Sequence, residues 1–308
     1  WGIPMATDIA FAIGALALLA SRVPKALITF LVALAIVDDL GAVVVIAVFY
    51  TDTIAVTPLL VGAGIIGLML ALNLLGVRKT IPYFLLAVLL WLALLKSGVH
   101  ATLAGVLGAL TVPAIPRYDP IRFSEQVKTL MKRFDASYEP GKSIMTNTEL
   151  RAVVQTLENG VHAVETPLQR LEHAWHMPVA YLVIPIFALA NAGIPIDISS
   201  LGSTLSHPVM LGTAFGLVLG KFIGISLVCW LMLKWNMAVL PKDTQFSQIM
   251  GVSLLAGIGF TMSIFVAELA FAGEADNLLM AKTGVLLASL IAGISGYIWL
   301  LMVSKKPA

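Results

Sequence analysis

Apolar runs of membrane-spanning length recur along this chain, and they constrain its fold more than any other feature. A helix of about 20 predominantly apolar residues crosses a bilayer core, and most of the apolar runs here reach or approach that length. Since 59% of the residues are hydrophobic and only 12% are charged, a soluble core cannot account for the composition. We therefore expect an all-α polytopic membrane protein.

The runs and the stretch between them suggest three parts. Residues 1–112 are expected to hold membrane segments 1–5, residues 113–167 a Pro-rich, charged cytoplasmic loop with a surface helix near 149–166, and residues 168–308 membrane segments 6–9. The basic residues gather in alternate loops. The positive-inside rule then places the C-terminus in the cytoplasm. The segments lie at about 1–20, 25–50, 57–75, 81–95, 100–112, 168–192, 208–233, 247–271 and 279–303.

Two adjacent carboxylates, Asp38 and Asp39, interrupt one of the longest apolar runs. An ionised Asp at the centre of a membrane helix costs roughly 2.5 to 3.5 kcal/mol on insertion scales, and intramembrane acids usually serve a function. Neighbouring helical positions point about 100° apart, so both side chains can border one cavity only if it wraps that side of the helix. The pair is the primary candidate for a site that exchanges protons and a cation.

A single lysine, Lys221, accompanies these acids at membrane depth, within the glycine-rich run Gly216-Leu-Val-Leu-Gly-Lys-Phe-Ile-Gly224. Glycines let another helix or an ion cavity come close. A lysine this deep needs a carboxylate partner, and Asp38 and Asp39 are both candidates. Glu268, nearer a segment end, is expected to have a structural role at the extracellular interface.

Two segments look easy to interrupt. Residues 251–265 contain Gly257 and Gly259 among several hydroxyl side chains, which favours a local break near residues 257–263. Thr7 and Thr261 each begin a Thr-x-x-x-Phe pattern in segments of opposite orientation, which suggests an inverted repeat with an ion site where the half-helices meet. Asp8 is placed to compensate their dipoles.

Four stretches closely resemble the bacterial sodium/proton antiporters of the NhaA type, and the resemblance covers nearly the whole chain. The stretches are Ala6-Thr-Asp-Ile-Ala-Phe11, Ala33-Leu-Ala-Ile-Val-Asp-Asp-Leu-Gly-Ala42, Lys96-Ser-Gly-Val-His-Ala-Thr-Leu-Ala-Gly105 and Gly257-Ile-Gly-Phe-Thr-Met-Ser-Ile-Phe265. The resemblance implies the inverted-repeat antiporter fold, in which two interrupted transmembrane helices cross. Relative to that pattern, the chain is expected to lack roughly the first three helices.

The resemblance also implies roles for particular residues. Asp39 would be the principal Na⁺-binding carboxylate, Asp38 its partner in ion and proton exchange, and Lys221 the partner of Asp38. Thr7, Asp8, Gly257, Gly259 and Thr261 would form the crossing of the broken helices. A pH-responsive group would comprise His100, Glu172, His173 and His176, although each histidine can equally be a satisfied polar group at a helix end.

The activity implied by the resemblance is electrogenic, pH-regulated export of Na⁺ or Li⁺ in exchange for H⁺. The protein would be a secondary transporter of the bacterial inner membrane, surrounded by membrane lipid and able to form a homodimer. No cofactor is expected. ATP-driven transport is disfavoured, because the sequence has no Gly-rich phosphate loop, zinc spacing or serine triad. The net charge of +2 gives no reason to expect nucleic acid as a partner.

Two other classes remain as alternatives. A sodium-coupled solute symporter would also place carboxylates in the membrane, and it differs by requiring an organic solute for Na⁺ flux. An intramembrane aspartyl protease needs two acids that face each other across a water molecule, whereas neighbours on one helix splay apart. The second alternative is therefore strongly disfavoured.

Overall fold

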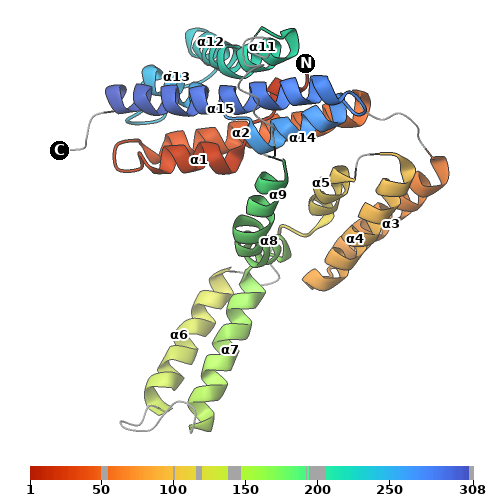
Figure 1. The fold of residues 1–308 in the computed structure, drawn as a ribbon. Coiled ribbons are helices and arrows are strands. Elements are labelled where there is room, and N and C mark those ends of the chain that lie inside the picture. Colours follow the sequence, from red (N-terminus) through yellow and green to blue (C-terminus); the bar gives the residue numbers. More distant parts are fainter. Residues whose placement is uncertain are drawn as a thin grey trace. The chain divides into compact units, whose positions relative to one another are not determined.

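The computed structural model describes residues 1–49, 55–99, 101–115, 120–137, 147–191, 193 and 206–304, and the described parts contain helices and no strand. They divide into two compact units, one of residues 1–51 and 184–308 and the other of residues 52–183. Each unit is helical, as the composition predicts (Figure 1).

The first unit holds both segments that were expected to be interrupted. Near the N-terminus, the short helix η1 (Ile3–Met5) is followed by α1 (Ile9–Ala17) and the long α2 (Lys25–Phe49). Later come α9 (Ile184–Asn191), α11 (Pro208–Phe215), the π-helical turn η4 (Gly216–Gly220), α12 (Lys221–Lys234), α13 (Phe246–Leu255), α14 (Phe260–Ala270) and α15 (Ala275–Val303).

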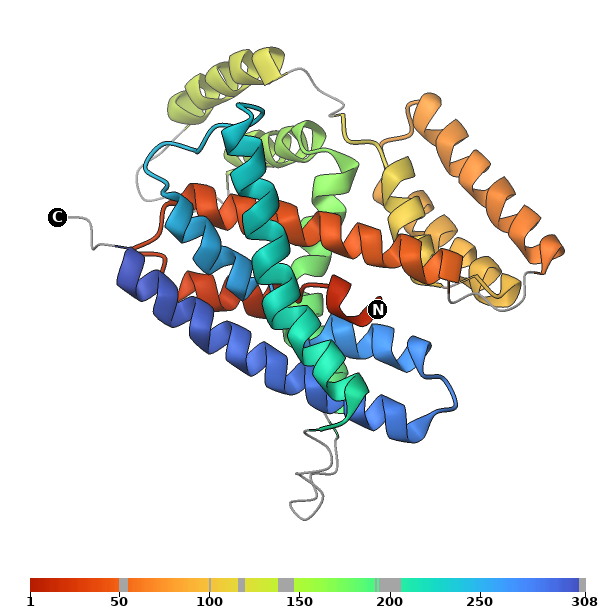
Figure 2. The ribbon, with the colours of Figure 1, turned by 90° about the horizontal axis from the view of Figure 1, so that it is seen from above.

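Small residues let α15 pack closely against its neighbours. Gly284 faces the Met210 carbonyl of α11, where a Cβ would come within 2.8 Å of that oxygen. Gly296 faces the Leu255 side chain of α13, where a Cβ would come within 2.8 Å of a methyl carbon. Close backbone approach through glycine is the usual packing mode of membrane helices. Figure 2 shows the resulting layering, with α11 and α12 crossing over the other helices of this unit.

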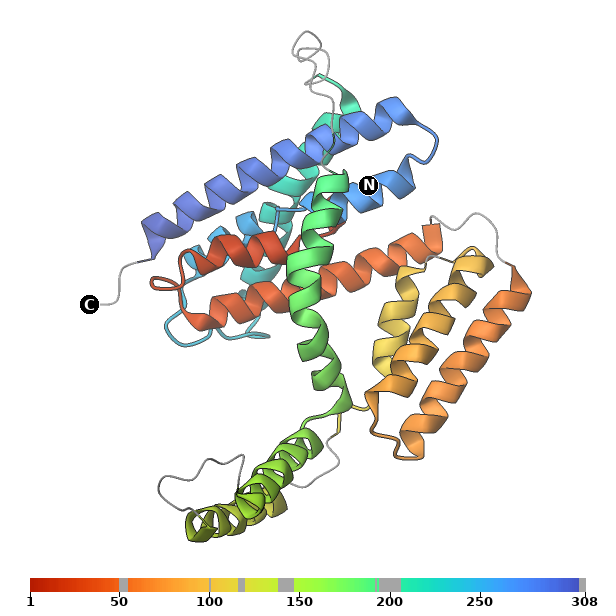
Figure 3. The same cartoon turned by 60° about the horizontal axis from the view of Figure 1, so that its bottom comes forward.

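The second unit contains two groups of helices (Figure 3). In one group α3 (Val56–Leu74), α4 (Thr80–Ser97) and α5 (Thr102–Thr111) lie side by side, and α8 (Pro167–Pro178) packs on α4. The other is a hairpin of α6 (Pro120–Ser137) and α7 (Thr148–Val164). The turn η2 (Val179–Val183) follows α8. Helix α7 confirms the helix expected near 149–166, whereas α6 was not foreseen.

Six helices of the described residues are long and apolar enough to cross a membrane, and seven if the bent pair of α13 and α14 counts as one span. They are Lys25–Phe49, Val56–Leu74, Thr80–Ser97, Pro167–Ala190, Pro208–Lys234 and Ala275–Val303. The two remaining expected segments, Ile3–Ala17 and Thr102–Thr111, are apolar but shorter. A chain with this many spanning helices must satisfy its backbone polar groups within the helices.

Candidate ion-binding site

The interruptions in the two broken segments contact each other. One lies between η1 and α1, and the other between α13 and α14, which meet at an angle of 50°. The backbone N–H of Asp8 donates a hydrogen bond to the Ile258 carbonyl over 2.7 Å. The polar backbone of each break is thus partly satisfied by the other, which is how broken helices are tolerated at membrane depth.

The Asp8 carboxylate lies at the beginning of two helices. Its Oδ1 accepts a hydrogen bond from the Phe11 N–H at 3.2 Å and so caps α1. Its Oδ2 accepts from the Thr261 N–H in the first turn of α14 at 3.0 Å, and from the Thr261 hydroxyl. The residue is only 3% exposed. A carboxylate at two helix N-termini offsets two partial positive charges with one group.

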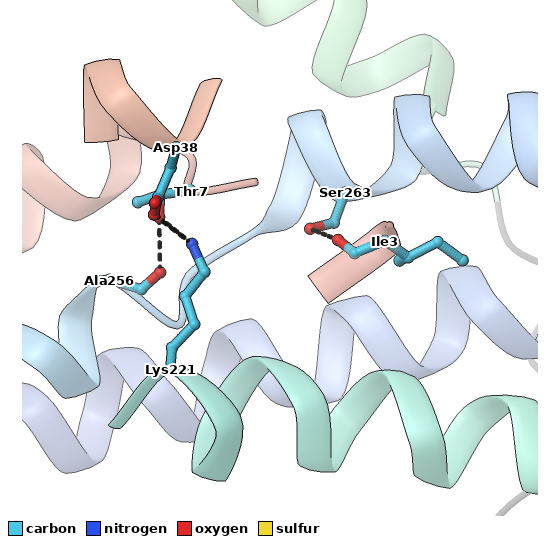
Figure 4. A network of polar contacts seen from close by, with 6 residues as sticks. All are labelled: Ile3, Thr7, Asp38, Lys221, Ala256 and Ser263. Atoms are coloured by element: carbon cyan, nitrogen blue, oxygen red, sulfur yellow. Dashed lines mark hydrogen bonds and ion pairs between the residues drawn. The ribbon is translucent and has the colours of Figure 1, made fainter. Parts of the chain in front are cut away.

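Lys221, Asp38 and Thr7 form a polar cluster beside this crossing (Figure 4). The Lys221 ammonium lies 2.7 Å from Asp38 Oδ2 and also donates to the Thr7 hydroxyl. The Thr7 Oγ1 is 2.9 Å from Asp38 Oδ2 and 3.0 Å from the Ala256 carbonyl oxygen. Because a hydroxyl has one proton, Thr7 can donate to only one of these two acceptors at a time.

Asp39 differs from Asp38 in what surrounds it. Its Oδ1 is buried and has no hydrogen-bond partner among the residues that the structure describes. A buried carboxylate oxygen without a partner is costly, and a bound cation or proton removes that cost. Lys221 therefore neutralises Asp38, whereas Asp39 Oδ1 remains available to bind a cation or a proton.

A cavity of about 380 Å³ opens beside the cluster. Asp38 and Lys221 line it, together with Gly216, Gly220 and Gly224, which lie on one face of η4 and α12 because they are four residues apart. An added Cβ would meet nothing within 4 Å at Gly224 and only the Phe215 carbonyl, at 3.9 Å, at Gly220, so these two glycines leave room beside Lys221. Glycine spacing in the sequence was the available signal for this cavity.

Gly257 and Gly259 lie in the α13–α14 break, and neither of these two positions has space for a side chain. A Cβ on Gly257 would come within 2.6 Å of the Leu217 carbonyl oxygen, and one on Gly259 would overlap the Ser263 hydroxyl. That hydroxyl donates to the Ile3 carbonyl at 2.8 Å, a contact that the sequence did not suggest (Figure 4). The Ala256 carbonyl was also missed, because a backbone ligand has no side-chain signature.

Three of the residues expected to respond to pH lie in the second unit. Glu172, His173 and His176 lie exposed on α8 of the second unit. Helix α8 begins with a capping box between Thr166 and Gln169. His100, the remaining residue of the expected group, lies outside the described residues.

Comparison with known proteins places the chain in a family. The family model "Na+/H+ antiporter 1" matches residues 1–300. The Na(+)/H(+) antiporter NhaA 1 of Saccharophagus degradans is 55% identical over 300 residues, which cover 97% of this chain and 65% of that protein. The NhaA antiporter of Sulfurimonas denitrificans is 49% identical over 306 residues, 99% of this chain and 69% of that protein.

A third relative, the NhaA antiporter of Dichelobacter nodosus, is 48% identical over 300 residues, with 97% of this chain and 65% of that protein covered. The chain thus spans about two-thirds of the length of the curated relatives it matches. With its spanning helices and these matches, the chain belongs to the Na⁺/H⁺ antiporter 1 family of membrane transporters and is a multi-pass membrane protein.

Proposed function

We propose that the protein exchanges Na⁺ or Li⁺ for H⁺ at Asp38 and Asp39. The observation that carries the proposal is the contrast between the two carboxylates: Asp38 is held by Lys221 at 2.7 Å, while the buried Asp39 Oδ1 has no partner among the described residues. Hard oxygen ligands suit a hard cation such as Na⁺. Asp39 is accordingly the principal Na⁺ ligand.

Exchange requires, first, that Na⁺ and protons compete for the same oxygens. When Na⁺ binds Asp39 and Asp38, the negative charge of Asp38 is shared between Na⁺ and Lys221. The protons carried by these three residues are then released. When protons bind, Na⁺ is released. The Thr7 hydroxyl supports this change, because its proton can turn from Asp38 Oδ2 to the Ala256 carbonyl and leave the carboxylate oxygen free.

The exchange is electrogenic if more than one proton replaces each Na⁺. The two carboxylates and the amine of Lys221 can each bind one proton, which supplies enough proton-binding groups. Transport then follows the membrane potential, at about 2.3 kcal/mol per charge per 100 mV. No covalent step is involved, so the protein acts as a secondary active transporter.

The site must open to one side of the membrane at a time. In inverted-repeat transporters, one group of helices moves around a site near the membrane midplane. The crossing of η1–α1 with α13–α14 supports such an arrangement. The distribution of basic residues favours a cytoplasmic C-terminus, and the resemblance to bacterial antiporters favours the bacterial inner membrane.

Regulation by pH is assigned to Glu172, His173 and His176 on α8. An imidazole is the side chain whose charge most readily changes near neutral pH, and neither histidine is covered by the described parts of the chain. The resemblance to the antiporter family favours slower transport at acidic pH. His100 belongs to the same proposal on the resemblance alone.

The decisive experiment uses the natural full-length protein in proteoliposomes with a preformed pH gradient. Na⁺ and Li⁺, but not K⁺, should discharge the gradient, and Asp39→Asn should abolish the discharge. Melting of the variant shows whether it is folded. Unchanged discharge by Asp39→Asn would refute the site. Na⁺ flux that needs an added organic solute would favour the sodium-coupled symporter instead.

A further inference from the structure

A second cavity, of about 720 Å³, lies in the first unit away from the acidic pair. Its wall is formed by the turn between α1 and α2, the loop between α12 and α13, and the last residue of α15. Its lining includes the charged residues Arg22, Lys25, Lys242 and Asp243 and the amide of Gln248. None of them has a role in the exchange proposed above.

This cavity lies where membrane-spanning helices end. Lys25 is the first residue of the span Lys25–Phe49, and Val303 is the last residue of the span Ala275–Val303. Helix α13, the first half of the bent pair, begins at Phe246 just after the loop that contributes Lys242. Headgroups of phospholipids occupy the zone at the ends of spanning helices.

The charges around the cavity are unbalanced. Arg22, Lys25 and Lys242 supply three positive charges, and Asp243 supplies the one negative charge among the lining residues. None of the three cations forms an ion pair within the described part of the chain. The N-terminal end of the 25-residue helix α2 adds a partial positive charge.

The buried Gln248 side chain in the wall is already hydrogen-bonded at both ends. Gln248 is 6% exposed, its Oε1 accepts from the Gln245 N–H at 3.0 Å, and its Nε2 donates to the Ser304 hydroxyl at 3.2 Å. These bonds hold the start of α13 against the end of α15. The cavity therefore has a fixed wall and cations that are free to bind an anion.

We propose that this cavity binds the phosphodiester headgroup of an anionic phospholipid, such as phosphatidylglycerol. The position at the ends of the spans favours a lipid over a free anion, since the acyl chains can extend along the apolar helix surfaces. Basic pockets between membrane helices are a known mode of anionic headgroup binding. This proposal depends on the protein being a membrane protein and does not depend on its transport activity.

Native mass spectrometry of the purified full-length protein tests this directly, with phosphatidylglycerol or phosphatidylcholine added in detergent. The wild type should bind phosphatidylglycerol in preference to phosphatidylcholine. Lys242→Gln should weaken phosphatidylglycerol binding about fivefold, and Arg22→Gln with Lys242→Gln about 25-fold, because each basic residue contributes a similar factor near an anionic surface.

Lys234→Gln is the matched control. Lys234 ends α12 and precedes the same loop, but its ammonium lies 4.7 Å from the Trp230 ring and does not line the cavity. The Lys234→Gln variant should bind phosphatidylglycerol with an affinity within about twofold of the wild type. Equal losses in Lys242→Gln and Lys234→Gln would overturn the proposal in favour of diffuse surface charge. Displacement of the lipid by millimolar inorganic phosphate would overturn it in favour of a free anion.

Discussion

Lys221 and Asp38 form an ion pair of 2.7 Å although 183 positions separate them in the sequence. The side chains are 9% and 22% exposed. An ion pair that is this deeply buried gives little net stability relative to an apolar pair, but removing one partner leaves a charge without compensation. The pair thus ties the stability of the first unit to the charge state of the site.

Lys221→Met should therefore destabilise the protein, since it leaves the Asp38 carboxylate without its cation. We expect the melting temperature to fall by about 5 °C or more. Asp38→Asn combined with Lys221→Met should recover at least half of that loss, because the double variant removes both charges. Losses that simply add in the double variant would show that the two residues are not energetically coupled.

Thr7 offers a test of the hydroxyl that joins three groups of the cluster. Thr7→Val keeps the shape of the side chain but deprives Asp38, Lys221 and the Ala256 carbonyl of a partner, at a cost of about 1 to 3 kcal/mol. Thr7→Ser keeps the hydroxyl and is the matched control. The half-saturating Na⁺ concentration for gradient discharge should rise about tenfold in Thr7→Val and little in Thr7→Ser. Similar values for both variants would exclude a role for the hydroxyl.

The helix break and the spanning helices could be predicted from the sequence. Gly257 and Gly259 predicted the break after α13 because glycine weakens a helix, and the apolar runs predicted the spanning helices. The sequence left open whether Lys221 pairs with Asp38 or Asp39. Neighbouring positions on α2 point about 100° apart. Which of the two carboxylates pairs with Lys221 therefore depends on how α12 packs in the unit, and in the structure the partner is Asp38.

Other features had weak or no sequence signals. Helix α6 was interpreted as loop because charged residues and prolines surround it, although Phe123, Val127, Leu130 and Phe134 recur at helical spacing. Phe123 packs on Gly160 of α7 within this hairpin. The Ala256 carbonyl near Thr7 could not be predicted, since backbone ligands depend on the path of the chain and not on residue type.

The α13–α14 break can be tested by adding a methyl group where the structure has no room. In Gly257→Ala the Cβ would lie 2.6 Å from the Leu217 carbonyl and 3.0 Å from the Leu254 carbonyl, and backbone atoms cannot move aside cheaply. We expect a loss of about 1 to 3 kcal/mol, seen as a lower melting temperature. Gly14→Ala, in α1 with nothing within 4 Å of the added Cβ, should leave the melting temperature unchanged or raise it. An unchanged melting temperature in Gly257→Ala would mean that the Gly257 backbone lies farther from the Leu217 carbonyl than the structure shows.

Another ion pair of the first unit, Lys282–Glu268, tests whether burial decides how much such a pair contributes. Lys282 and Glu268 are also close, at 2.8 Å, but Glu268 is 39% exposed and water can replace its partner. Exposed ion pairs contribute about 0 to 1 kcal/mol. Lys282→Met should therefore lower the melting temperature by about 2 °C at most, much less than Lys221→Met, and should leave Na⁺-driven discharge of the pH gradient intact. If the two lysine variants were equally destabilised, the geometry of the pairs, and not their burial, would determine their contribution.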